Sequence, residues 1–223
     1  MAEKIAFVGL GIMGKPMAKN LMEAGYELYV YDLFPDPVAE LEKDGAIGCA
    51  SASEASSNTN ITVTMVQDGP QAESAILGEG GVVHGATKGH LVVDMSSIAP
   101  GVSQRIGKGC SDKGVNFLDA PVSGGEPFAI SGDLAIMVGG SADDFEQAKP
   151  LFDILGKSAI LCGEHGAGQI TKLANQICVG ANIHALAEAL ALAAKAGVNP
   201  ETVYKAIQGG LAGSNVINAK APM

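Results

Sequence analysis

The chain has 223 residues, 47% of them hydrophobic, which suffices for one large domain or for one domain and a smaller second one. Its formal net charge of -10, from 14 basic and 24 acidic side chains without an obvious basic patch, argues against binding to nucleic acid or an anionic membrane. No apolar run approaches the ~20 residues of a membrane span and no signal peptide precedes the first strand, so we expect a cytoplasmic protein with no membrane partner.

Strand and helix patterns alternate from residue 4 to about residue 161. Strands are expected at Lys4–Val8, Glu27–Tyr31, Ala46–Gly48, Ile61–Thr64, Leu91–Asp94, Asn116–Asp119, Leu134–Val138 and Ser158–Leu161. Helices are expected at Met13–Ala24, Pro37–Lys43, Ser53–Ser57, Pro70–Leu77, Pro100–Lys113 and Asp143–Leu155. This alternation predicts an α/β fold with a doubly wound, mostly parallel sheet and helices on both faces.

The first expected strand runs into a glycine-rich turn that opens a helix. The GxGxxG turn consists of Gly9, Leu10, Gly11, Ile12, Met13 and Gly14. Gly9 permits the tight turn, Gly11 lets the backbone approach a pyrophosphate, and Gly14 lets the helix pack closely on the strand. The next strand leads to Asp32, about 20 residues past the motif, where a carboxylate can accept both ribose hydroxyls of NAD. This context favours a Rossmann-type dinucleotide site over a structural turn.

The composition changes after Gly163. Residues 169–196 contain no proline and one glycine, with apolar side chains on nearly every face, so we expect a largely buried helix of roughly 42 Å. A shorter helix is expected at Glu201–Gln208, and the tail from Leu211 shows no capping or closing signal. We therefore expect an NAD(P)-binding domain over residues 1–163, and an interdomain helix with part of an all-α domain over residues 164–223. Because so little chain follows the long helix, either a second subunit covers it or the chain is a fragment.

The four cysteines and four histidines show no spacing typical of metal ligands, so we expect reduced thiols and no metal site. His165 lies in a glycine-rich loop, where a role in shaping the loop is favoured over catalysis. Ser123, Gly124 and Gly125 follow a predicted strand. Their backbone N–H groups and the serine hydroxyl could bind carboxylate or phosphate oxygens, but an ordinary turn explains them equally well.

Lys172, Asn175 and Gln176 are spaced i, i+3 and i+4, on one face of the long helix. A lysine among apolar residues is costly unless it is exposed or paired, and burial would lower its pKa toward that of a general acid. The spacing alone favours the alternative, a lysine that extends to the surface.

The segments GLGIMGKPMAKN, DAPVSGG and GxGxxxKxxN occur together and in this order. Over essentially the whole chain, the sequence resembles the β-hydroxyacid dehydrogenase family. DMSSIAP (94–100), DAPVSGGEP (119–127), TKLANQ (171–176) and GGLAGS (209–214) most resemble the branch that reduces tartronate semialdehyde. Many relatives have Asn-Asn at the positions of Asn175 and Gln176. The Asn-Gln pair of this chain instead resembles the branch that reduces tartronate semialdehyde. The resemblance also implies several tens of further residues beyond Met223, with a further lysine at the site.

The resemblance implies a role for each candidate residue. Lys172 would be the catalytic acid/base, and Asn175 would orient the substrate and support the lysine. The substrate would be bound by Ser123, Gly124, Gly125, Asn175 and Gln176. Ser97 would contact the nicotinamide end of the cofactor, while Met65 and Val66 would line its channel.

The expected reaction is NAD(P)-dependent reduction of tartronate semialdehyde (2-hydroxy-3-oxopropanoate) to glycerate. Because Leu33 rather than arginine follows Asp32, we expect NAD, although the family also uses NADP. The expected partners are a small carboxylate-bearing aldehyde or hydroxyacid and further copies of the chain. One alternative is 3-hydroxyisobutyrate or another short β-hydroxyacid or semialdehyde as substrate; 6-phosphogluconate is disfavoured by chain length. In a different class, the chain would bind cofactor with little catalysis.

Overall fold

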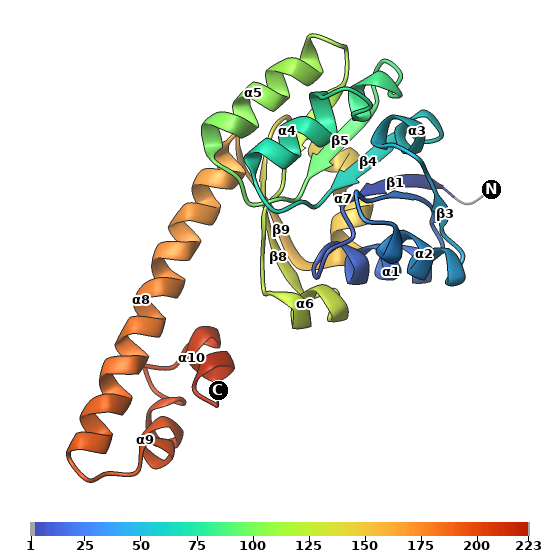
Figure 1. Ribbon diagram of the computed structural model, residues 1–223. Coiled ribbons are helices and arrows are strands. Elements are labelled where there is room, and N and C mark those ends of the chain that lie inside the picture. Colours follow the sequence, from blue (N-terminus) through green and yellow to red (C-terminus); the bar gives the residue numbers. More distant parts are fainter. Residues whose placement is uncertain (1–2, 223) are drawn as a thin grey trace. The chain divides into compact units, whose positions relative to one another are not determined.

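The computed structural model describes residues 3–222 (Figure 1). Its strands are β1 (Lys4–Val8), β2 (Glu27–Tyr31), β3 (Ile47–Gly48), β4 (Ile61–Thr64), β5 (Leu91–Asp94), β6 (Asn116–Asp119), β7 (Val122–Ser123), β8 (Leu134–Gly139) and β9 (Gly156–Gly163). Its helices are α1 (Gly14–Glu23), α2 (Pro35–Lys43), α3 (Ala52–Ser57), α4 (Gly69–Leu77), the 3-10 turn η1 (Val82–His84), α5 (Pro100–Ser111), α6 (Glu126–Ser131), α7 (Ala142–Leu155), α8 (Ala167–Lys195), α9 (Pro200–Ile207) and α10 (Asn215–Lys220). Two compact units make up the chain, the first ending at Lys172 and the second beginning at Leu173.

The sheet of the first unit has the order β3-β2-β1-β4-β5-β6-β8-β7, with β9 beside β8. From β3 to β6 all neighbouring strands are parallel, whereas β8 runs antiparallel to β6 and β7 and parallel to β9. The order reverses between β1 and β4. In an open α/β sheet, ligands bind at such a switch point, outside the carboxyl ends of the strands. The expectation of a doubly wound, mostly parallel α/β sheet is confirmed.

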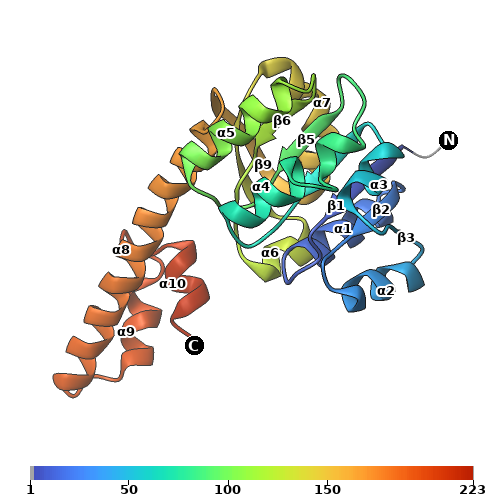
Figure 2. The same cartoon turned by 45° about the horizontal axis from the view of Figure 1, so that its top comes forward.

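Buried apolar side chains fill both faces of this sheet. On one face Phe7 packs in a core with Met17 of α1 and Phe152 of α7, and on the other Val92 packs with Ile76 of α4 and Ile106 of α5. Figures 1 and 2 show α4 and α5 on the opposite side of the sheet from α1. Strands buried on both faces are mostly apolar, as in β1 and β5, where only Lys4 at the start of β1 and Asp94 at the end of β5 are charged.

Several expected boundaries differ from the structure by one or two residues. Three helices begin earlier than expected because their capping side chain is Ser51, Asp68 or Ser141, each accepting a hydrogen bond from a backbone N–H three residues on. Four short elements were not expected at all, namely β7, η1, α6 and α10. The expectation that the tail contains no capping signal was wrong. The Ser214 hydroxyl accepts a hydrogen bond from Ile217 N (3.1 Å) at the start of α10.

The expectation that the long helix is largely buried was also wrong for the described residues. In its most apolar 18-residue window, which has a mean hydropathy of 1.6, only 11% is buried. Ile177 and Leu192 are 74% and 71% exposed. By length and composition α8 could cross a membrane, contrary to the expectation from the sequence. One such helix is a weak indication, because the core helix of a soluble protein passes the same test.

The second unit consists of the remainder of α8 with α9 and α10. Leu186 and Ala193 of α8 and Ile217 of α10 are its buried apolar side chains among the described residues. The side chain of Asn199 accepts hydrogen bonds from Glu201 N (2.8 Å) and Thr202 N (3.2 Å), and Pro200 occupies the first turn of α9. α8 ends at Lys195, one residue before the expected end at 196, and Gly197 just beyond it has a φ of +76°.

Candidate dinucleotide and substrate site

The glycine turn after β1 leaves little space at two positions and open space at the third. Gly9 has φ of +94°, and a Cβ there would lie 2.9 Å from Val66 Cγ1. A Cβ on Gly14 would collide with the Gly9 carbonyl oxygen and lie 3.2 Å from the Phe7 ring, so the helix packs tightly on the turn. Around Gly11 no atom lies within 4 Å of that position, so a ligand can approach the backbone there.

Asp32 is held beside this turn by two backbone hydrogen bonds. Its Oδ2 accepts from Leu10 N (2.6 Å) and its Oδ1 accepts from Phe34 N (2.8 Å). An ionised carboxylate has about four acceptor positions, so each oxygen can accept a further hydrogen bond from a ligand hydroxyl. The half-buried carboxylate is therefore oriented in advance for a diol.

A cavity of about 430 Å³ lies along the strand ends at the switch point. It brings together five of the candidate residues, Gly9, Gly11, Asp32, Met65 and Val66. Leu33, from which NAD was expected, also lines the cavity, together with residues that the sequence did not single out, among them Phe34, Gln67, Gln71, Ser74 and Glu79. Leu33 and Phe34 are 77% and 70% exposed, and their signal in the sequence was an apolar pair directly after Asp32, the acid that follows β2.

Leu10 and Ile12 line a second cavity, also of about 430 Å³, between α1 and α6. Lys15 and Lys19 line it as well, but each already forms an ion pair on α2 or its end, with Glu40 (2.7 Å) and Asp44 (2.8 Å). Met13 precedes the first turn of α1. Gly11 lines both cavities, so the turn separates two hollows of similar size.

Ser123 ends β7, which pairs with β8, and Gly124 and Gly125 lead into α6 with φ of +148° and +71°. A Cβ on Gly124 would lie 2.5 Å from Phe128 Cβ, so a side chain there would displace α6. The two glycines thus shape a tight turn between β7 and α6.

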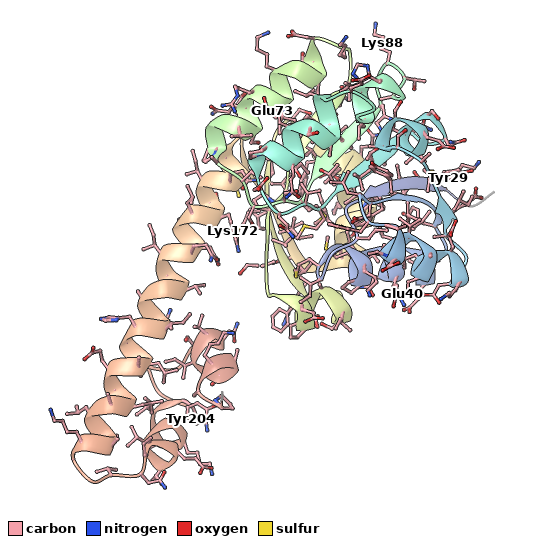
Figure 3. The ribbon with its side chains drawn as sticks, in the orientation of Figure 1. Tyr29, Glu40, Glu73, Lys88, Lys172 and Tyr204 are labelled. Atoms are coloured by element: carbon pink, nitrogen blue, oxygen red, sulfur yellow. The ribbon has the colours of Figure 1, made fainter. Side chains whose placement is uncertain are left out.

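Lys172 lies in the first part of α8 and is labelled in Figure 3. Its side chain is half-buried, and this burial lowers the pKa of its ammonium group. Asn175 and Gln176 follow on α8, where Asn175 Nδ2 donates a hydrogen bond to Gln176 Oε1 (2.9 Å). A lysine with a lowered pKa releases its proton nearer neutral pH, as a general acid must.

Buried polar groups connect the ends of β4 and β5. Asp94 is fully buried, and its Oδ1 accepts hydrogen bonds from Thr64 Oγ1 (2.8 Å) and Ser96 N (3.2 Å). Burial raises the pKa of Asp94 to about 6. Ser97, which follows the buried Ser96 in the segment between β5 and α5, is exposed. Ser96 and Ser97 cannot be distinguished by local pattern, because only the fold buries Ser96 and leaves Ser97 exposed.

Two histidines of the first unit, His90 and His165, have ring contacts that indicate a structural role. His165 Nε2 lies 2.8 Å from the Phe117 carbonyl oxygen, and its ring packs edge-on against Phe117, in agreement with a role in shaping the loop. His90 is buried between Thr62 Oγ1 (2.8 Å) and the Thr59 carbonyl oxygen (3.2 Å), and burial lowers its pKa to about 4. Within residues 3–222 no group of three His, Cys, Asp or Glu side chains could hold a metal ion.

Two protein-family models match the chain. The first, described as the NAD binding domain of 6-phosphogluconate dehydrogenase, covers residues 4–164. The second, described as NAD-binding of NADP-dependent 3-hydroxyisobutyrate dehydrogenase, covers residues 166–223. Together they leave almost none of the chain unmatched.

The chain is also similar to characterised proteins. It is 46% identical over 215 residues to the 2-hydroxy-3-oxopropionate reductase of Escherichia coli, covering 96% of this chain and 73% of that protein. It is 37% identical over 218 residues to a 3-hydroxyisobutyrate dehydrogenase of Pseudomonas aeruginosa, covering 98% and 73%. Among solved structures, 3-hydroxyisobutyrate dehydrogenase of Mycobacterium tuberculosis with L-serine matches with a TM-score of 0.88 and 30% identity, over 100% of this chain and 76% of that one.

Proposed function

The chain belongs to the β-hydroxyacid dehydrogenase family, NAD(P)-dependent oxidoreductases that act on a CH–OH group, and from this premise we propose that it reduces tartronate semialdehyde to glycerate. The assignment of the substrate is supported by sequence identity, which is higher to the Escherichia coli 2-hydroxy-3-oxopropionate reductase than to the Pseudomonas aeruginosa 3-hydroxyisobutyrate dehydrogenase. The second candidate substrate is 3-hydroxyisobutyrate, because residues 166–223 match the model named for that enzyme.

The residues around the first cavity fit a dinucleotide. The backbone at Gly11 is open to a pyrophosphate, and the Asp32 carboxylate is positioned for a ribose diol. We assign the cofactor to Gly9, Leu10, Gly11, Ile12, Met13, Gly14, Asp32, Met65, Val66 and Ser97. Because a carboxylate repels the 2′-phosphate of NADP, the proposed cofactor is NAD. When bound, the nicotinamide supplies the hydride for reduction and accepts it in the reverse reaction.

The chain's own groups would bind the substrate and move the proton. Ser123 Oγ and the N–H groups of Gly124 and Gly125 would bind the carboxylate, which fixes the position of the carbonyl group. Lys172 Nζ would donate a proton to the carbonyl oxygen as negative charge develops there, and Asn175 and Gln176 would orient the substrate. The lowered pKa of Lys172 supports this assignment.

We also propose that residues 1–163 form the NAD(P)-binding domain and residues 164–223 an interdomain helix with part of an all-α domain. The change from one family model to the other at residues 164–166 supports this division. The compact units divide slightly later, within α8. A cytoplasmic location and self-association complete the proposal.

A substrate panel tests the function. The intact gene product is assayed with tartronate semialdehyde, methylmalonate semialdehyde and succinate semialdehyde, each with NADH and with NADPH. We expect the highest kcat/KM for tartronate semialdehyde with NADH. A higher kcat/KM for methylmalonate semialdehyde, the oxidation product of 3-hydroxyisobutyrate, would favour the second candidate. Tight NADH binding without turnover of any β-hydroxyacid substrate would instead indicate a protein that only binds cofactor.

A further inference from the structure

We propose that Asp119 and Gln169 are positioning residues. Together they fix the first turn of α8, the helix on which Lys172 lies, against the segment that contains Ser97. Neither residue touches the candidate cofactor cavity, and both lie in the first unit. The inference rests on the proposed role of Lys172 as the proton donor. It explains how a lysine on a helix and a loop beyond a strand keep one relative geometry.

Asp119 caps α8 from the end of a neighbouring strand. It is fully buried at the end of β6, with Oδ1 accepting from Gly166 N (2.7 Å) and Oδ2 accepting from Gln169 N (3.0 Å). The first N–H groups of a helix lack partners within the helix, and negative charge is favourable at that end. The carboxylate therefore sets both the start and the direction of α8.

Two glycines leave room for this carboxylate. A Cβ on Gly139 of β8 would lie 2.6 Å from Asp119 Oδ1, and a Cβ on Gly168 of α8 would lie 2.8 Å from Asp119 Oδ2. Real side chains do not approach so closely, so the neighbouring elements close around Asp119 only because both residues are glycine. The seat of the carboxylate is thus built from β6, β8 and α8.

Gln169 connects the same turn to the segment after β5. Its side chain is 1% exposed, and its Nε2 donates to the Ser96 carbonyl oxygen (2.7 Å) while its Oε1 accepts from Ile98 N (3.1 Å). The two ends of the amide thus hold the backbone on both sides of Ser97. The Ser96 carbonyl can only accept and the Ile98 N–H can only donate. Both backbone groups are therefore satisfied only when Nε2 of the amide faces Ser96 and Oε1 faces Ile98.

The connection continues to the next strand end. Ser96 Oγ accepts a hydrogen bond from Val66 N (2.9 Å), so α8, the segment after β5 and the segment after β4 form one bonded series. Lys172 follows Gln169 by three residues and lies on the same side of α8. Because a misplacement of about 1 Å can cost about 100-fold in rate, loss of these bonds should lower kcat.

Two substitutions of Gln169 separate positioning from simple stabilisation. Gln169→Met keeps the length of the side chain and removes both hydrogen bonds, so we expect kcat to fall about 10- to 100-fold at every pH. Gln169→Glu keeps the acceptor toward Ile98 N but can donate to the Ser96 carbonyl only when protonated. Its kcat, divided by that of the unsubstituted enzyme, should therefore rise as the pH falls from 8 to 6.

The ratio corrects for ionisable groups that both proteins share. These are Asp94 at the end of β5, Asp119 at the end of β6, His165 before α8 and Lys172 within it. Gln147→Met, an exposed glutamine of α7, is the matched control and should leave kcat and its pH dependence unchanged. Melting temperatures are measured for every variant, and kcat is expressed per site that binds NADH.

The assay uses whichever β-hydroxyacid or semialdehyde the unsubstituted enzyme converts fastest, so the result does not depend on the proposed substrate. If Gln169→Met keeps kcat within about two-fold and only its melting temperature falls, the residue is structural and the inference is wrong. If Gln169→Met does not fold, the decision rests on Gln169→Glu, for which a pH-independent ratio overturns the inference. Lys172→Ala is assayed in parallel, because full activity there refutes the proton donor and not the hydrogen-bonded series.

Discussion

At the scale of single residues, the proposed chemistry depends on one ammonium group and one carboxylate. Lys172 is half-buried in the first part of α8, and its pKa is lowered by that burial. Asp32 is held by two backbone N–H groups beside an open glycine turn. The proposed roles of the two side chains, proton transfer and cofactor choice, are separable, and separate substitutions test them.

Replacing Lys172 by alanine should lower kcat by about 10²–10⁴, the usual cost of losing a general acid, with NADH affinity nearly unchanged. Lys172→Arg should not restore activity, because a guanidinium group does not release its proton near neutral pH. Lys149→Ala, on the exposed side of α7, is the control. Steady-state kinetics and NADH titration of the intact gene product provide the measurement. A variant that keeps more than about a tenth of kcat would assign the lysine a structural role.

Replacing Asp32 by alanine should narrow the preference for NADH. A hydrogen bond to a charged group contributes about 1.5–3 kcal/mol, which corresponds to a loss of about 10- to 100-fold in kcat/KM for NADH. NADPH should lose less, because the substitution also removes a repulsion from its 2′-phosphate. Asp36→Ala on α2 provides a nearby control of equal charge. If the unsubstituted enzyme has a higher kcat/KM with NADPH, the proposed preference is wrong from the start.

At the scale of elements, local patterns were sufficient for most of the sheet and insufficient for its connections. β1 and its glycine turn were predictable because four of the five residues of β1 are apolar and buried, and because the turn has a fixed spacing. β7 and α6 were not, since two and six residues carry too little periodicity. The bonds of Asp119 join residues 47 and 50 positions apart, which no local pattern shows. In the candidate site, Asp32 was predictable by the same logic, and Gln169 was not.

The buried His90 makes the junction of β4 and β5 sensitive to pH. Its pKa is about 4 in the folded protein against about 6.5 in an unfolded chain. The unfolded state therefore binds more protons below pH 6.5, and stability falls as the pH decreases toward 4. The loss amounts to about 3 kcal/mol at pH 4.

Urea unfolding of the unsubstituted protein and of His90→Gln at several pH values isolates this contribution from that of Asp94, whose raised pKa acts in the opposite direction. Above pH 7 the stability difference between the two proteins should be constant. Between pH 6.5 and 4 it should shift in favour of the glutamine variant. A difference that stays constant down to pH 4 would mean that His90 is protonated in the folded protein.

At the scale of the whole molecule, α8 is the feature that the sequence described least well. Its apolar residues lie on nearly every face, so the pattern could not distinguish a helix buried within one chain from a helix that another surface covers. In the second unit, Leu173, Ile177 and Leu192 fall within one side of the helix by their spacing and are 53%, 74% and 71% exposed. Leu173 and Ile177, one turn apart, expose apolar surface together, and exposed apolar patches mark interaction surfaces.

We therefore predict that the protein self-associates through this side of α8. Ile177→Glu should shift the equilibrium toward the monomer, because association would bury a charge in an apolar contact. Ala206→Glu adds the same charge on the exposed side of α9 and should leave the association unchanged. Sedimentation velocity between about 1 and 100 μM, a range that spans micromolar dissociation constants, provides the measurement. If the unsubstituted protein is monomeric throughout that range, then another partner, rather than a second copy, must cover the helix.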